Sequence, residues 1–207
     1  MWIEIIATIL ILFPSIVLHE YAHGWMANRL GDPTAKEHGR LTLNPLKHID
    51  PVGTLLVPGI LLVLMAMGIN HFVFGWAKPV PVNFGRLSNP KKDMIGVALA
   101  GPAVNIILAL LASQVLRLDL ASMARGFFEL MVFFNLLLAV FNMIPIPPLD
   151  GSRVVMGLLP NRWAFLYSRL EPYGILIVAG LLYLGLFDRL LLGIVKYLEN
   201  LLGVPAV

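Results

Sequence analysis

The chain has 207 residues, of which 58% are hydrophobic and 13% charged, and its mean hydropathy is +0.84. Soluble domains carry about a quarter charged residues, so the composition excludes an ordinary soluble protein. It predicts a single all-α membrane domain over residues 1–207, a polytopic helical bundle with about four to six transmembrane segments. The net charge of +3 comes with no basic run longer than Lys91-Lys92, which argues against nucleic-acid binding. The lack of cysteine excludes disulfides and thiolate zinc ligands.

The first apolar run extends from Trp2 to about Asn28 and is long enough to span a bilayer, since about 20 helical residues cross the hydrocarbon core. Pro14 interrupts this run near its middle. No Lys or Arg precedes the run, so we expect the first helix to stay in the mature protein and not to be cleaved as a signal peptide. The polar stretch from Arg29 to Pro51 is expected to be a loop.

Within the first run lies His19-Glu20-Tyr21-Ala22-His23. Two histidines four residues apart project from one face of a helix about one turn apart, so both imidazoles can bind one Zn²⁺. Glu20 then stands beside the metal, where it can act as general base toward a zinc-bound water. Ionisable groups at membrane depth are costly unless they pair or bind something. The sequence therefore predicts a zinc site, one ion per chain, with Glu20 as its catalytic base.

The next apolar stretch, Val52 to Ile69, has 18 residues and contains the pair Pro58-Gly59, where a helix would break. In the polar segment after it, Lys78 to Phe84 cannot be helical, because alternate prolines remove donors and push the preceding residues toward extended angles. Extended backbone near the site could pair with an unwound substrate by strand addition. A plain connecting loop is the alternative interpretation.

Three further apolar runs are predicted to span the membrane. They are Met94 to Leu116, Gly126 to Ile144 and Tyr173 to Leu192, with a short turn from Arg117 to Arg125 and an interfacial tail from Lys196 to Val207.

A zinc site needs at least three protein ligands, and Asp150 is the best candidate for the third. It follows a predicted span on a proline-bounded turn, and Gly151 permits backbone angles that would direct its side chain inward. Asp150 could instead cap a helix that begins near Ser152, since Asp is a favoured N-cap. His48 and Asp50, in the polar stretch after the first run, are the alternative ligands.

Three motifs together resemble the site-2 protease family of intramembrane zinc metalloproteases. They are the His-Glu-x-x-His motif, Ala100-Gly101-Pro102-Ala103-Val104-Asn105, and Phe141-Asn142-Met143-Ile144-Pro145-Ile146-Pro147-Pro148-Leu149-Asp150-Gly151. The resemblance implies cleavage of a substrate's transmembrane segment, with His19, His23 and Asp150 as zinc ligands and Glu20 as the catalytic acid/base. Ser152 stands where many members carry a second glycine, and the chain shows no peptide-binding or nucleotide-sensing module, so it resembles a short, minimal member.

Two asparagines lie inside predicted spans, where an unpaired amide is expensive. Asn142 and Asn105 could donate hydrogen bonds to the substrate carbonyl as it becomes an oxyanion. They could equally bond between helices. Asn135 is expected to serve helix packing, and Glu129 to lie at the membrane interface.

The predicted site constrains the topology. For Asp150 to reach the histidines, the first and third clear spans must end on the same side of the membrane. Residues 52–69 must then re-enter the membrane or lie in its interface. In the competing model residues 52–69 span the membrane, and Asp150 lies on the side opposite the histidines. The zinc-side face then holds eleven of the 15 basic residues, and the positive-inside rule makes it cytoplasmic. The eleven are Arg29, Lys36, Arg40, Lys47, Lys78, Arg86, Lys91, Lys92, Arg153, Arg162 and Arg169.

These features together favour an intramembrane zinc endopeptidase of the cell membrane that acts on membrane proteins with a transmembrane segment. A zinc-binding transporter or sensor without proteolytic activity is the alternative from another class. Transport needs no glutamate beside the first ligand and usually shows paired halves. A non-catalytic scaffold is a third option, and the complete set of ligands and base argues against it.

Overall fold

A computed structural model describes residues 2–68 and 75–204, and within these ranges the chain is helical with connecting loops and no strand. Four helical stretches are long and apolar enough to cross a membrane: Ile6–Arg29, Pro90–Val115, Ser122–Asn142 and Asn161–Tyr183. The predicted class, a polytopic helical membrane protein, is therefore confirmed.

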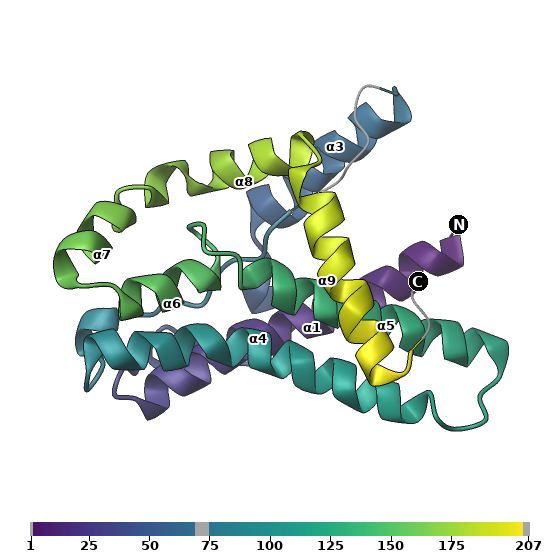
Figure 1. The fold of residues 1–207 in the computed structure, drawn as a ribbon, viewed down its shortest axis with the longest axis horizontal. Helices are drawn as coiled ribbons and strands as arrows, with labels where there is room; N and C mark the ends of the chain where they lie inside the picture. Colours follow the sequence, from purple (N-terminus) through teal and green to yellow (C-terminus); the bar gives the residue numbers. More distant parts are fainter. Residues whose placement is uncertain (1, 69–74, 205–207) are drawn as a thin grey trace.

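The central bundle consists of α1 (Trp2–Arg29), α4 (Pro90–Val115) and α5 (Ser122–Asn142), with α4 in contact with both others (Figure 1). α1 continues through Pro14. On α4, the buried Ala109 and Ala112 pack against Val132 and Leu136 of α5. Small side chains of this kind let helix backbones approach closely in a membrane. The predicted first, second and third spans are confirmed to within a few residues at each end.

The polar stretch after α1 is more structured than the expected loop. It contains α2 (Thr34–Glu37) and the 3₁₀-helix η1 (Pro45–His48). Asn44 begins η1, because its Oδ1 accepts a hydrogen bond from the Leu46 amide at 3.1 Å. Short helices of this length carry too little periodicity to be read from sequence.

The apolar stretch after it forms a π-helical turn, η2 (Pro51–Leu56), that continues into α3 (Val57–Ala66). The predicted break at Pro58-Gly59 is wrong, because Pro58 lies in the first turn of α3, where its missing N–H is not needed. Residues on either side of this stretch meet, because the Trp76 amide donates to the Gly53 carbonyl at 3.0 Å. This geometry agrees with re-entry and not with a span. The end of the predicted run, Ile69, lies outside the described residues.

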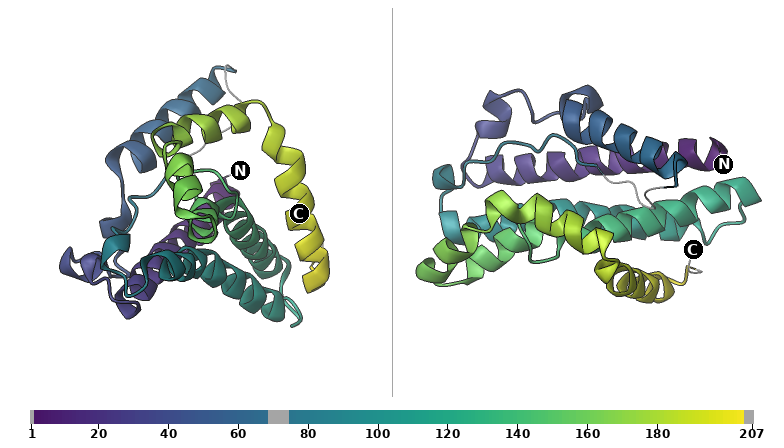
Figure 2. Two further views of the ribbon diagram at one scale, coloured as in Figure 1. Left: turned by 60° about the vertical axis from the view of Figure 1, so that its left-hand side comes forward. Right: turned by 90° about the horizontal axis from the view of Figure 1, so that it is seen from above.

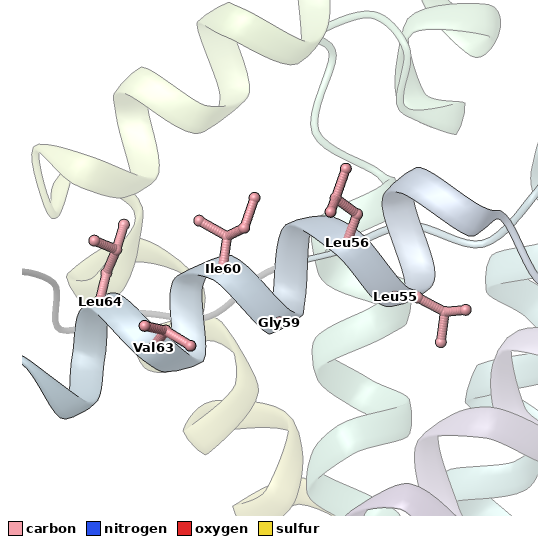
Figure 3. Close-up of a pocket in the computed structure, with 6 residues that line it drawn as sticks. All are labelled: Leu55, Leu56, Gly59, Ile60, Val63 and Leu64. Atoms are coloured by element: carbon pink, nitrogen blue, oxygen red, sulfur yellow. The ribbon is translucent and has the colours of Figure 1, made fainter.

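α3 lies at the periphery of the bundle, as do α8 and α9 (Figure 2), and its principal contacts are with η2. An apolar groove of about 350 Å³ runs along it, and the lining side chains project from successive turns (Figure 3). The groove is lined by Leu55, Leu56, Gly59, Ile60, Val63 and Leu64. Several of these side chains are more than half exposed, which suits a helix in contact with lipid.

After α5 the chain turns irregularly through residues 143–149 and then forms α6 (Asp150–Leu158), α7 (Asn161–Ser168), η4 (Glu171–Tyr173), α8 (Gly174–Tyr183) and α9 (Leu186–Leu202). The predicted span from Tyr173 to Leu192 is wrong. Gly185 has a φ of 65°, a left-handed conformation that ends α8 and redirects the chain. α9 instead crosses α5 and packs against it (Figure 1). The predicted tail from Lys196 belongs to α9 as far as Leu202.

Candidate metal centre

Three side chains from distant parts of the sequence converge beside α4. His19 and His23 come from α1, and Asp150 is the first residue of α6. The Asp150 Oδ2 lies 3.1 Å from His19 Nε2 and 3.3 Å from His23 Nε2, and the two Nε2 atoms are 3.0 Å apart. Among the described residues, these three form the group that could hold a metal ion. The structure thus brings together all three of the ligands predicted from sequence.

The irregular turn after α5 places the aspartate. A Cβ at Gly151 would lie 2.2 Å from the Met143 carbonyl oxygen, so only glycine lets the start of α6 fold back against the end of α5. Leu149 is the N-cap of α6 and Asp150 already lies inside the helix, and the contacts described for the Asp150 carboxylate are with the two histidines. The alternative in which Asp150 caps a helix beginning near Ser152 is therefore wrong in this structure.

Hydrogen bonds to the outer ring nitrogens determine the histidine tautomers. The Met131 carbonyl accepts from Asn135 Nδ2 at 2.9 Å, so Asn135 Oδ1 must accept from Asn105 Nδ2, at 3.0 Å. Asn105 Oδ1 is then an acceptor for the Nδ1–H of His19, at 2.6 Å. The Val97 carbonyl accepts from the Nδ1–H of His23 at 2.7 Å. In its neutral form, each ring therefore carries its lone pair on Nε2, the nitrogen that faces Asp150.

This donor set fits a cation. With both rings neutral, two imidazole lone pairs and one carboxylate oxygen converge, and a metal cation is the kind of group that such a donor set binds. Tetrahedral zinc with bonds of 2.0–2.1 Å separates its ligand atoms by about 3.3 Å, close to the distances observed here. Two histidines and one carboxylate also leave the fourth position open, as catalytic zinc sites do.

Gly101 of α4 covers the site from the other side. A Cβ there would lie 2.4 Å from His23 Nε2 and 2.6 Å from His19 Nε2, so any larger side chain would enter the space where the metal ligands meet. Asn105 lies one turn further along α4 on the same face, and it is fully buried. The four-residue spacing of Gly101 and Asn105 is the sequence signal that could have shown Asn105 to support a ligand.

Glu20 points away from the histidine hydrogen-bond network toward residues 78–84. Its Oε2 accepts a hydrogen bond of 2.8 Å from the backbone amide of Val80. Residues 75–83 form no helix, as the alternating prolines predicted, and Val80 lies directly beside the predicted catalytic base. The prediction is wrong for its last residue, because Phe84 begins the 3₁₀-helix η3 (Phe84–Arg86), where Asn83 Oδ1 accepts from the Gly85 amide. The expected extended segment therefore lies at the site, without the partner strand that would make it part of a sheet among the described residues.

The other predicted site residues lie elsewhere. His48 is fully buried and its Nε2 lies 2.9 Å from the Thr42 carbonyl oxygen, while Asp50 caps η2 by accepting from the Gly53 amide at 2.6 Å. Both stabilise the polar stretch and neither joins the metal group. Asn142 is in the last turn of α5, where its Nδ2 donates to the Leu138 carbonyl at 2.9 Å. No described contact joins Asn142 to the three converging side chains, and its predicted contact with substrate stays a prediction.

The chain is similar in sequence to a known peptidase family and to several named proteins. The sequence model of peptidase family M50 matches residues 117–185, which include Asp150 but not the histidines. The candidate zinc metalloprotease YwhC of Bacillus subtilis is 38% identical over 82% of this chain and 76% of its own. The candidate zinc metalloprotease Rip2 of Mycolicibacterium smegmatis is 30% identical over 93% of this chain and 72% of its own. Rip2 of Mycobacterium tuberculosis is 26% identical over 92% of this chain and 71% of its own. No solved structure matches the chain at a significant level.

Proposed function

The chain belongs to peptidase family M50, the site-2 protease family, and from this membership we propose that it is an intramembrane zinc endopeptidase. One observation carries the proposal: two imidazoles on a helix that can span the membrane converge with the Asp150 carboxylate, and Glu20 follows the first of them in sequence. The relatives named above are described by their names as zinc metalloproteases, and the donor set suits that metal. When bound, Zn²⁺ would lower the pKa of a coordinated water to about 7 and polarise the substrate carbonyl.

The protein's own groups supply the proton transfers. Glu20 accepts a proton from the attacking water as the water oxygen bonds to the peptide carbonyl carbon. When the carbon–nitrogen bond breaks, Glu20 returns that proton to the leaving amine. The hydrogen bond from Val80 holds one oxygen of the Glu20 carboxylate, which leaves the other oxygen for the water. Asn142 remains a candidate donor to the developing oxyanion: it is the last residue of α5, and Nδ2 has a second hydrogen besides the one that it donates to the Leu138 carbonyl.

The proposed substrates are membrane proteins with a transmembrane segment. Helical substrate carbonyls are hydrogen-bonded and screened from attack, so cleavage requires local unwinding. The segment 78–83 supports that requirement, because an extended backbone can pair with an unwound chain and needs little sequence specificity to do so. We place the protein in the cell membrane with its site toward the cytoplasmic half, on the argument of the basic residues above.

The experiment that tests the proposal is proteolysis of a model transmembrane substrate by the purified chain, together with metal analysis. We expect about one zinc per chain. Glu20→Gln should keep the zinc and lower kcat by about 100-fold or more, because an amide cannot accept the water's proton. An unchanged kcat in Glu20→Gln would rule out the mechanism. Zinc-dependent transport by the wild type without proteolysis would instead support the transporter or sensor alternative.

A further inference from the structure

Arg40 is a buried cation that the reaction described so far does not use. Its side chain lies in the polar stretch after α2 and only 9% of the residue is exposed. It forms no ion pair with the part of the chain that the structure describes. Burying a charge without a partner is costly, so the contacts that Arg40 does make are informative. Its Nη2 donates to two backbone carbonyls, Lys78 at 2.8 Å and Pro79 at 3.2 Å.

The second of these carbonyls belongs to the peptide group that binds Glu20. The peptide unit between Pro79 and Val80 accepts from Arg40 through its oxygen and donates to Glu20 through its N–H, at 2.8 Å. The peptide dipole has its negative end at the oxygen, beside the cation, and its positive end at the N–H, beside the anion, so both charges favour this orientation of the peptide. Hydrogen bonds joined through one peptide group also polarise each other. Arg40 and Glu20 are thus joined through a single peptide group.

The sequence provides few backbone N–H groups that could donate to Glu20 from this segment. Pro79 and Pro81 have no N–H, so the Val80 amide is the only backbone donor in the stretch 79–81. The segment is also fixed at both ends: the Lys78 amide donates to the His48 carbonyl at 2.9 Å, and the Asn83 amide donates to Asp32 Oδ2 at 2.6 Å. Between these two ends, the hydrogen bonds of the Pro79–Val80 peptide group are those with Arg40 and Glu20.

We propose that Arg40 is a positioning residue for the reaction, which holds the Glu20 carboxylate in place through the Pro79–Val80 peptide group. This inference rests on the proposed function, because Glu20 must be the base for its position to affect the rate. The hydrogen bonds described for Arg40 are with the Lys78 and Pro79 carbonyls and not with the metal ligands. It acts on the orientation of the segment and hence on the alignment of Glu20 with the water.

The test compares Arg40→Gln with Arg40→Lys and with a matched control, Arg86→Gln. Arg86 is an exposed arginine that binds Glu37 through two hydrogen bonds of 2.6 and 2.9 Å, and exposed pairs contribute little. Measurements are kcat and KM for a model transmembrane substrate, zinc content, and the rate at which a thiol reagent labels Val80→Cys. The chain has no cysteine of its own, and Val80 is buried, so labelling reports release of the segment.

We expect Arg40→Gln to lower kcat by about tenfold or more, the size of a lost charge-assisted hydrogen bond, with KM and zinc content unchanged. Labelling of Val80→Cys should be faster in that variant. Arg40→Lys, which keeps the charge and three donors, should recover part of the lost kcat. Arg86→Gln should match the wild type in every measurement.

An unchanged kcat in Arg40→Gln overturns the proposal, as does an equal loss in Arg40→Gln and Arg40→Lys. Loss of zinc in Arg40→Gln also overturns it, because Arg40 would then maintain the metal site or the fold and not the base. If the wild type cleaves no substrate, the proposed function fails separately. The labelling rates still show in that case whether Arg40 holds the segment.

Discussion

Each polar atom at the metal centre is constrained by a partner that is itself constrained. The Met131 carbonyl orients Asn135, Asn135 orients Asn105, and Asn105 sets the tautomer of His19. A chain of this kind is needed because neutral imidazole can carry its proton on either nitrogen, and only one choice frees Nε2 for a metal. The buried asparagines that were candidates for substrate contact or helix packing therefore also support a ligand.

This chain makes Asn105→Ala a direct prediction at the scale of one residue. Without the Asn105 acceptor, His19 loses the partner that fixes its tautomer, and we expect zinc affinity to fall by about 10- to 100-fold. Competition with a chelator of known zinc affinity measures the change. The control is Ser113→Ala, a buried substitution on the same helix, where the hydroxyl donates to the Leu110 carbonyl and accepts from Gln114 Nε2. Equal zinc affinity in both variants would contradict the prediction.

At the scale of elements, the re-entrant excursion depends on a close approach between its two ends. A Cβ at Gly53 would lie 2.3 Å from the Trp76 ring, whereas a Cβ at Gly59, on the adjoining α3, would meet nothing within 4 Å. The Trp76 carbonyl also accepts a hydrogen bond from Thr54 Oγ1 at 2.9 Å. These contacts set where residues 78–83 begin, and so they help to place Val80 beside Glu20.

Gly53→Ala is therefore expected to destabilise the protein by about 1–3 kcal/mol, the usual cost of forcing extra volume into a packed site. Gly59→Ala is the matched control and should be neutral or stabilising by up to about 1 kcal/mol, because Ala favours helix over Gly. Thermal unfolding in detergent compares the two variants with the wild type. A lower unfolding temperature for Gly59→Ala than for Gly53→Ala would show that the close approach of Gly53 to Trp76 does not determine stability here.

At the scale of the whole molecule, the arrangement of helices fixes which loops share a side. α7 and the start of α4 lie at one end of the bundle, on the left of Figure 1, and the turn between α4 and α5 lies at the other end. The excursion through α3 returns to Gly53 and does not change sides. The ends of α1 and α5 can then both approach the metal centre, as the positions of His23 and Asp150 require.

Single cysteines in this cysteine-free chain test the arrangement. A membrane-impermeant thiol reagent should label His38→Cys, Ser88→Cys and Arg162→Cys from the same side, and Ala121→Cys from the opposite side. By the positive-inside rule the shared side is cytoplasmic. Labelling of positions 38 and 88 from opposite sides would mean that residues 52–69 span the membrane.

The sequence by itself determined the membrane class, three of the spans, and the placement of His19 and His23 beside Glu20 on one helix. Apolar runs of about 20 residues are decisive because the bilayer demands them. The four-residue spacing of His19 and His23 is decisive because helix geometry alone puts them on one face. Asp150 was predicted to join the histidines, and the structure places it beside them, but from the residues alone it competed with a capping role and with His48 and Asp50.

Only the tertiary structure decided among those alternatives, because they depend on distances between segments far apart in the chain. The same holds for the contact between Asn105 and His19, 86 residues apart, and for the contact between Val80 and Glu20, 60 residues apart. The sequence misplaced the last span because the Gly185 backbone is compatible with a helix as well as with the left-handed conformation that ends it. The local sequence pattern limits which secondary structure a segment can form, whereas tertiary packing determines which polar side chains of different segments come into contact.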